Sequence, residues 1–143
     1  MTMTIKTLTL LLQGAALLHV GLICAGASMP KAVGLRANLA TLPPFIRRLF
    51  FVYYMFIGLM LVGFGTLTFL FADNMARGEP LARGLCILLA VFWSLRLLCA
   101  AFVFDVRPYL TTPFYRIGYQ ALNLAFIYIL IIYFITAIQG GTR

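Results

Sequence analysis

The apolar residues of this 143-residue chain fall into four long runs, separated by short stretches that contain proline, glycine or charge. The runs cover about residues 7–29, 45–72, 81–104 and 114–138. A helix rises about 1.5 Å per residue, so about 20 apolar residues cross a hydrocarbon core of about 30 Å. The pattern therefore predicts an all-α integral membrane protein. We expect one domain, residues 1–143, with four transmembrane helices in an up-down-up-down bundle.

The connection between the first two runs is the longest, at residues 31–48. It carries three leucines at helical spacing, Leu35, Leu39 and Leu42. This spacing allows a short helix in the membrane interface, with Arg36 turned to the head groups. Pro43 would end that helix, and Pro44 suits the first turn of the next one. Residues 73–79 are expected to form a tight loop that makes the second and third spans neighbours.

A second interpretation of the first run is a secretory signal. Lys6 precedes the apolar stretch, and Ala-Gly-Ala at positions 25–27 resembles a cleavage site. In that case residues 1–27 would be removed from the mature protein. The run is long for a signal and contains Gln13 and His19, so we favour a retained span.

Small residues recur on single faces of two runs. Gly58 and Gly65 lie seven residues apart, and an interval of four separates Cys86, Ala90 and Ser94. Rows of small residues let membrane helices approach closely. They predict packing seams, either within the bundle or with a protein partner or a second copy of the chain.

The composition fits a lipid environment, because 64% of the residues are hydrophobic and only 10% are charged. Eleven Lys and Arg against three Asp and Glu give a formal charge of +8. In a soluble protein this charge would suggest nucleic acid as a partner. Here the basic residues stand mostly at the ends of the runs, so we expect contacts with anionic head groups and no nucleic-acid partner. The head-group contacts are expected near Lys31, Arg36, Arg47 and Arg48.

The basic residues also predict an orientation. The first and third connections, with their flanks, carry six of them, Lys31, Arg36, Arg47, Arg48, Arg107 and Arg116. The termini and the second connection, with its flank, carry four, Lys6, Arg77, Arg83 and Arg143. The positive-inside rule then places the first and third connections in the cytoplasm and both termini outside. Many small proteins of bacterial inner membranes have four spans, and that membrane is the location we expect.

One basic residue, Arg96, lies inside a span, where an unpaired guanidinium is costly. Arg96 lies eight residues inside its run, while Asn123 lies nine and His19 ten residues inside theirs. These spacings correspond to depths of about 12, 14 and 15 Å from the same membrane surface. Three helices thus place polar groups in one layer, with Tyr119 and Gln120 about a turn shallower. We predict a ligand site from these five residues, with Arg96 donating to the Asn123 oxygen. The alternatives are that Arg96 reaches the head groups, or that the layer only joins helices.

Other chemistry has little support in the sequence. One histidine cannot supply two axial haem ligands, and the three cysteines are odd in number and form no CxxC. They are Cys24, Cys86 and Cys99, all inside apolar runs. The acidic residues lie in connections, and no nucleophile or metal motif occurs. We expect no metal, no cofactor and no enzyme activity.

Two functions remain. The first is an accessory, assembly or structural subunit of a larger membrane complex, which acts through helix–helix contacts. The alternative is a carrier, channel or receptor for a small anionic or quinone-like ligand, bound at the layer that contains Arg96, His19 and Asn123. The alternative follows from the rule that an ionisable residue inside a membrane marks a functional site by default.

Overall fold

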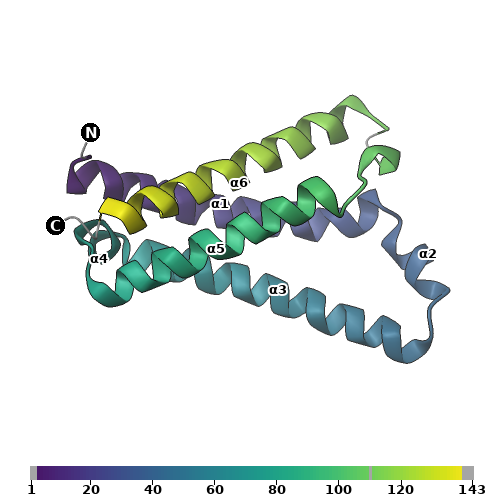
Figure 1. Ribbon diagram of the computed structural model, residues 1–143. Coiled ribbons are helices and arrows are strands. Elements are labelled where there is room, and N and C mark those ends of the chain that lie inside the picture. The colour runs from purple at the N-terminus through teal and green to yellow at the C-terminus, as the bar shows by residue number, and fades with distance from the viewer. Residues whose placement is uncertain (1–2, 110, 140–143) are drawn as a thin grey trace.

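The computed structural model describes residues 3–109 and 111–139. Its four long helices are α1 (Ile5–Ala32), α3 (Pro44–Leu70), α5 (Pro80–Phe102) and α6 (Pro113–Gln139). Each is long and apolar enough to cross a membrane, and their ends lie within three residues of the predicted ones. Successive long helices run in opposite directions (Figure 1). The predicted all-α bundle of four transmembrane helices is confirmed.

Proline starts three of these helices. Pro44, Pro80 and Pro113 are the first residues of α3, α5 and α6. The first turn of a helix has no acceptor for its N–H groups, so the N–H that proline lacks is not missed there. Before α6, the hydroxyl oxygen of Thr112 accepts a hydrogen bond from the Tyr115 N–H at 3.4 Å. These local signals explain why the helix starts agree with the sequence.

The predicted short helix between the first two spans exists as α2 (Leu35–Ala40). Gly34 precedes it with φ 59°, a left-handed conformation that glycine adopts at little cost. Leu39 is buried, whereas Arg36 is exposed. Figure 1 shows α2 crossing the gap between the ends of α1 and α3.

Residues 73–79 differ from the prediction. We expected a loop, but Ala72–Arg77 form a short helix, α4, which ends at Gly78 with φ 76°. The helix packs against α1, and its buried residues are Ala72, Met75 and Ala76. Apolar residues at positions i, i+3 and i+4 create one helical face, and burial of that face outweighs the tendency of Asp73 and Asn74 to stop a helix.

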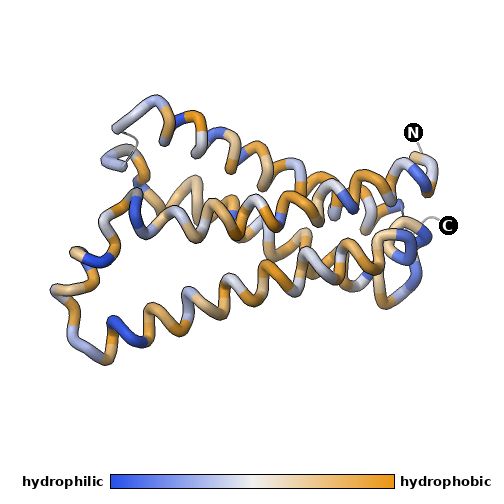
Figure 2. Tube along the Cα trace, turned by 180° about the vertical axis from the view of Figure 1, so that it is seen from behind, coloured by the Kyte–Doolittle hydropathy of each residue, from blue (hydrophilic) through white to orange (hydrophobic). Residues whose placement is uncertain are grey.

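Helix α1 forms the centre of the bundle, because it packs against α3, α4 and α6. Helix α5 packs mainly against α6. We expected α3 and α5 to be neighbours, but α3 packs mainly on α1 and touches α5 where Phe64 and Phe92 meet, with ring centroids 5.1 Å apart. From Phe64 towards its N-terminus, α3 diverges from α5 (Figures 1 and 2). No α3 side chain before Phe64 is buried.

The divergent half of α3 remains tied to α1 through a backbone carbonyl. Pro30 lies inside α1 and has no N–H for the carbonyl of Gly26, four residues earlier. The hydroxyl of Tyr54 on α3 donates to this carbonyl. Lipid tails could not satisfy such an acceptor, so the contact stabilises the pairing of α1 and α3. Helix α3 therefore keeps a polar contact with α1 at Tyr54, although it has already diverged from α5 there.

Charged residues gather at the two ends of the bundle, as the blue segments in Figure 2 show. The four residues predicted to meet head groups are all exposed near α2: Lys31, Arg36, Arg47 and Arg48. At the opposite end, Arg77 donates to the Asp73 carboxylate at 2.6 Å. This hydrogen bond and the carboxylate charge raise the pKa of Arg77 above its usual value. Arg143, which entered the predicted orientation, lies outside the described residues.

Candidate functional site

Arg96 lies on α5 and is half-buried. Its guanidinium carbon lies 5.6 Å from the ring centroid of Phe104 and 5.2 Å from that of Phe126. Both rings offer a cation–π contact, which attracts the charge but accepts no conventional hydrogen bond. The buried Nη1 atom has no hydrogen-bond partner among the described residues. Aromatic rings therefore hold this cation, while part of its donor capacity remains unused.

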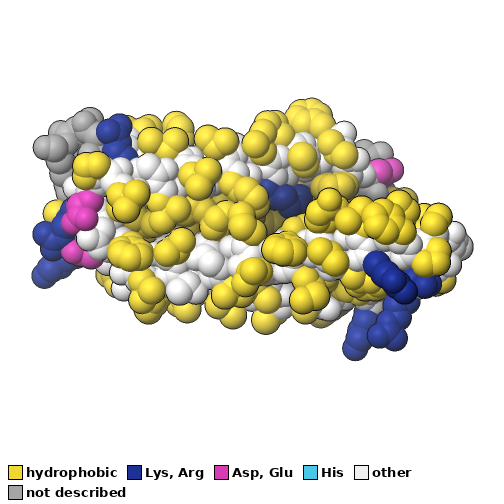
Figure 3. All heavy atoms as spheres, turned by 90° about the horizontal axis from the view of Figure 1, so that it is seen from below, with side chains coloured by type: hydrophobic (Ala, Val, Ile, Leu, Met, Phe, Trp, Pro, Cys, Tyr) yellow, Lys and Arg dark blue, Asp and Glu magenta, His cyan; other side chains and the backbone are white. Residues whose placement is uncertain are grey.

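The space between α3 and α5 forms a hollow, which we call the α3–α5 furrow. It lies between residues 44–64 of α3 and residues 92–102 of α5, where the two helices diverge. Figure 3 shows two apolar ridges with basic side-chain atoms in the hollow between them, away from the charged clusters at the ends. Arg96 is the basic residue of α5 within this stretch. The furrow thus combines apolar walls with a cationic group.

His19 lies on α1 and is 1% exposed. Its Nδ1–H donates to the Ala15 carbonyl at 2.8 Å, since that oxygen can only accept. The ring makes edge contacts with Trp93 at 5.4 Å and with Tyr133 at 6.4 Å between centroids. The Nε2 atom is buried without a hydrogen-bond partner in the described part of the chain. His19 is therefore part of an aromatic core formed with α5 and α6.

Trp93 connects His19 to the region of Arg96. Its ring centroid lies 5.2 Å from that of Phe126, and Phe126 in turn lies against Arg96. The indole Nε1–H is buried and, within the described ranges, has no acceptor. The structure thus joins His19 and Arg96 through two aromatic rings and gives no hydrogen bond between them. A buried acceptor on His19 and a buried donor on Trp93 lie on contacting rings.

The other predicted site residues do not join this arrangement. Asn123 is half-buried on α6, three residues before Phe126, and the structure gives no hydrogen bond between it and Arg96. Tyr119 lines a separate hollow of about 390 Å³ at the end of α5, formed with residues 100–106. Gln120 is exposed. The common depth predicted for the polar groups does not produce one connected hydrogen-bonded site.

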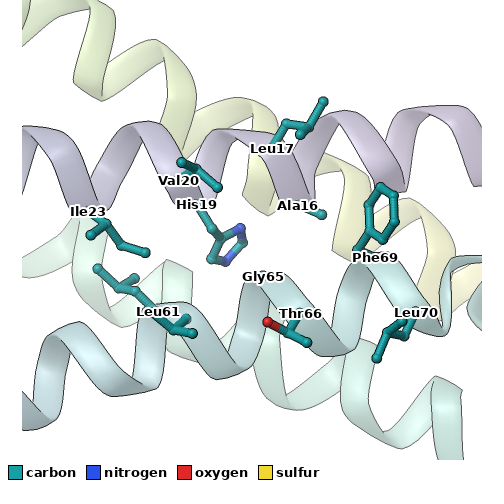
Figure 4. Close-up of a pocket in the computed structure, with 11 residues that line it drawn as sticks. Ala16, Leu17, His19, Val20, Ile23, Leu61, Gly65, Thr66, Phe69 and Leu70 are labelled. Atoms are coloured by element: carbon teal, nitrogen blue, oxygen red, sulfur yellow. The ribbon is translucent and has the colours of Figure 1, made fainter.

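A second cavity, of about 300 Å³, lies between α1 and α3 (Figure 4). Its lining is almost entirely apolar and includes His19, Leu61, Gly65 and Phe69. Figure 4 shows the His19 ring directed from α1 towards α3, next to Gly65. Several lining residues, among them Leu17, are exposed on the outer surface of the bundle. The cavity therefore opens to the lipid and suits an aliphatic chain.

The sequence analysis missed two polar contacts between spans. Thr68 donates to the Phe64 carbonyl at 2.7 Å, so its oxygen accepts from the Tyr133 hydroxyl at 2.6 Å. This pair joins α3 to α6 in the core. Arg83, counted above only for orientation, donates through Nε to the Ala137 carbonyl at 3.0 Å. No motif marks these residues in the sequence, although a threonine inside a membrane helix commonly bonds to the carbonyl four residues earlier.

These contacts define a class of protein, a four-span helical membrane protein with a buried histidine and an intramembrane arginine held by aromatic rings. Among the described residues, no group of three or more His, Cys, Asp or Glu side chains could hold a metal ion. Comparisons with protein-family models, with curated proteins and with solved structures each gave no match for this chain.

Proposed function

We propose that this chain is an accessory, assembly or structural subunit of a larger membrane complex. Its proposed location is a plasma membrane, the inner membrane of a bacterium, with the α2 end in the cytoplasm. It acts through helix contacts, since the connections between its long helices are too short to fold as domains of their own.

The observation that carries the proposal is the exposed half of α3 beside an unsatisfied cation. No α3 side chain before Phe64 is buried, and large apolar side chains such as Met55 and Leu59 are exposed there. Lipid alone could cover these side chains. It could not satisfy the part of the Arg96 side chain that remains exposed, because acyl chains offer no hydrogen-bond acceptor. A protein partner supplies both an apolar surface and polar groups.

Photo-crosslinking in native membranes tests the proposal. A crosslinking amino acid placed at Met55 or Leu59 should capture one defined protein in high yield. Leu124 on α6 is the matched control, because it is an apolar residue of similar exposure on another helix, and it should capture lipid. If the tagged chain is extracted alone and all these positions capture lipid only, the proposal is wrong.

A second candidate function is a carrier, channel or receptor for a small anionic or quinone-like ligand. It is favoured by the buried, unpartnered Nε2 of His19 and Nε1 of Trp93, which lie on contacting rings. A ligand with a hydroxyl or carbonyl group would satisfy such atoms, and the neighbouring cavity between α1 and α3 suits its aliphatic tail.

Thermal unfolding in detergent, with and without a short-chain quinone or a fatty acid, tests this candidate. A ligand should raise the unfolding temperature of the wild type. His19→Asn and Arg96→Gln should weaken its apparent Kd at least tenfold, whereas Cys24→Ser, at an exposed position, should not. If both site variants fold and keep the wild-type shift, the ligand site does not exist at these residues.

A further inference from the structure

The donor capacity of Arg96 is the starting point. A guanidinium carries five N–H donors, and the rings of Phe104 and Phe126 accept none of them as conventional hydrogen bonds. Nη1 is enclosed by this chain, but the side chain as a whole is only half-buried, and the structure gives no hydrogen bond from it to a described residue. In a membrane an unsatisfied charged donor is costly, so an acceptor at this position would be strongly favoured.

This chain has no carboxylate of its own at that depth. Its three acidic residues all lie outside the long helices. Asp73 accepts from Arg77 and Glu79 accepts from Asn74 at 2.9 Å, both at the α4 end. Asp105 follows α5 and has an interaction of its own. An ion pair for Arg96 would therefore need a carboxylate from another molecule.

The depth of Arg96 favours a helix over a lipid as the source of that acceptor. Arg96 lies six residues before the last residue of α5, which is about 9 Å along the helix axis. A lipid phosphate would reach the guanidinium only where the arginine side chain extends towards the head groups or the bilayer thins locally. A carboxylate on a transmembrane helix is held at such a depth by its own backbone, and it can accept two hydrogen bonds from one guanidinium.

The shape of the surface also favours a transmembrane helix as the partner. The α3–α5 furrow has apolar walls, and no α3 side chain along it before Phe64 is buried. An apolar helix would cover these walls, while a polar or water-filled passage would not.

We infer that the α3–α5 furrow binds a transmembrane helix of a partner protein, and that an Asp or Glu side chain of this helix pairs with Arg96. The inference rests on the proposed function and specifies the chemistry of the partner. The partner helix is apolar over about 20 residues. Its acidic residue lies level with Arg96, in the half of the membrane on the α2 side.

Co-purification of variants from native membranes tests the inference. Arg96→Met removes the charge and keeps a long side chain, and it should lower recovery of the partner at least tenfold. Arg96→Lys should keep part of the recovery, since the cation remains. Arg36→Gln on exposed α2 is the control for loss of a positive charge and should recover the partner like the wild type.

A crosslinker at Cys99 identifies the acidic residue, because Cys99 is exposed and lies three residues from Arg96 on the same helical face. Neutralising that residue in the partner should have the same effect as Arg96→Met. Combining Arg96→Glu with an arginine at the partner position should restore the complex. The partner variant also tests the pair if Arg96→Met fails to fold.

The outcomes separate the inference from the proposed function. If the wild type recovers a partner and Arg96→Met recovers it equally, the inference is wrong and the proposed function remains. Capture of anionic lipid alone at Cys99, together with an intact complex, also overturns the inference. If the wild type recovers no partner under any extraction condition, the proposed function itself fails.

Discussion

Gly65 on α3 packs directly against the side chain of His19 on α1, which is the closest neighbour of any glycine that the structure describes. A methyl group on Gly65 would place its carbon 2.9 Å from the His19 Cβ and 3.4 Å from the Ala16 carbonyl oxygen. Real side chains essentially never pack that tightly, so only glycine permits this approach. Within the predicted row of small residues, Gly65 therefore makes a close contact with another helix. Gly58 and Gly63 have no such neighbours within 4 Å.

Gly65→Ala should destabilise the bundle by about 1–3 kcal/mol, because the added methyl group forces α1 and α3 apart. Gly63→Ala is the matched control and should be neutral or slightly stabilising, since alanine favours helix and nothing lies near its Cβ. Unfolding in mixed micelles of increasing SDS content measures both. Equal stability of the two variants would contradict the close approach at Gly65.

Tyr54→Phe should destabilise the protein by about 0.5–1.5 kcal/mol, because it leaves the Gly26 carbonyl without a donor. The Gly26 carbonyl has no donor within α1, because Pro30 has no N–H. Pro30→Ala should supply that donor, and Tyr54→Phe should then lower the stability less. Tyr53→Phe, at an exposed neighbouring position, should change little. The same unfolding measurement applies, and an equal loss in Tyr53→Phe would argue against the contact.

The hydrogen bond between Thr68 and Tyr133 should show coupling in a double-mutant cycle. Thr68→Val and Tyr133→Phe each remove one partner and leave the other buried in the core. The double variant should be less destabilised than the sum of the two, with a coupling energy of about 0.6–2 kcal/mol. Thr68→Ser keeps the hydroxyl and should retain most of the stability. Additive single losses would show that the two hydroxyls do not interact.

The orientation predicts opposite labelling of two single-cysteine variants, made after the three native cysteines are replaced. In intact spheroplasts a membrane-impermeant maleimide should label Glu79→Cys at the α4 end. It should label Thr41→Cys, next to α2, only after lysis. The expectation follows from the excess of Lys and Arg at the α2 end. Reversed labelling would place the termini in the cytoplasm.

Most of the fold was accessible from the sequence, because each of its signals is local. Pro44, Pro80 and Pro113 start helices by their own geometry, and the apolar runs between them have the length of a bilayer core. The α4 segment was missed because Asp73 and Asn74 suggested a loop, while burial against α1 favoured a helix. That burial depends on the position of α1, which lies far away in the sequence.

The candidate site was predicted less well, because depth in the membrane is only one of the coordinates that decide a contact. Arg96 and Asn123 were expected at similar depths, yet Phe126 and not Asn123 lies against the guanidinium. His19 was expected in the same ligand site as Arg96, and its ring contacts Trp93 and Tyr133. The rotation of each helix about its axis decides these neighbours, and it depends on packing of the whole bundle.

The sequence by itself determined that this chain crosses a membrane four times, where its helices start, and that one arginine lies within the apolar layer. Hydropathy and proline geometry act over a few neighbouring residues, so they need no knowledge of the fold. Only the tertiary structure decided that α3 diverges from α5, that Tyr54 satisfies the carbonyl freed by Pro30, and that two aromatic rings contact Arg96. These features arise from the packing of helices distant in the chain, which hydrophobic pattern alone does not specify.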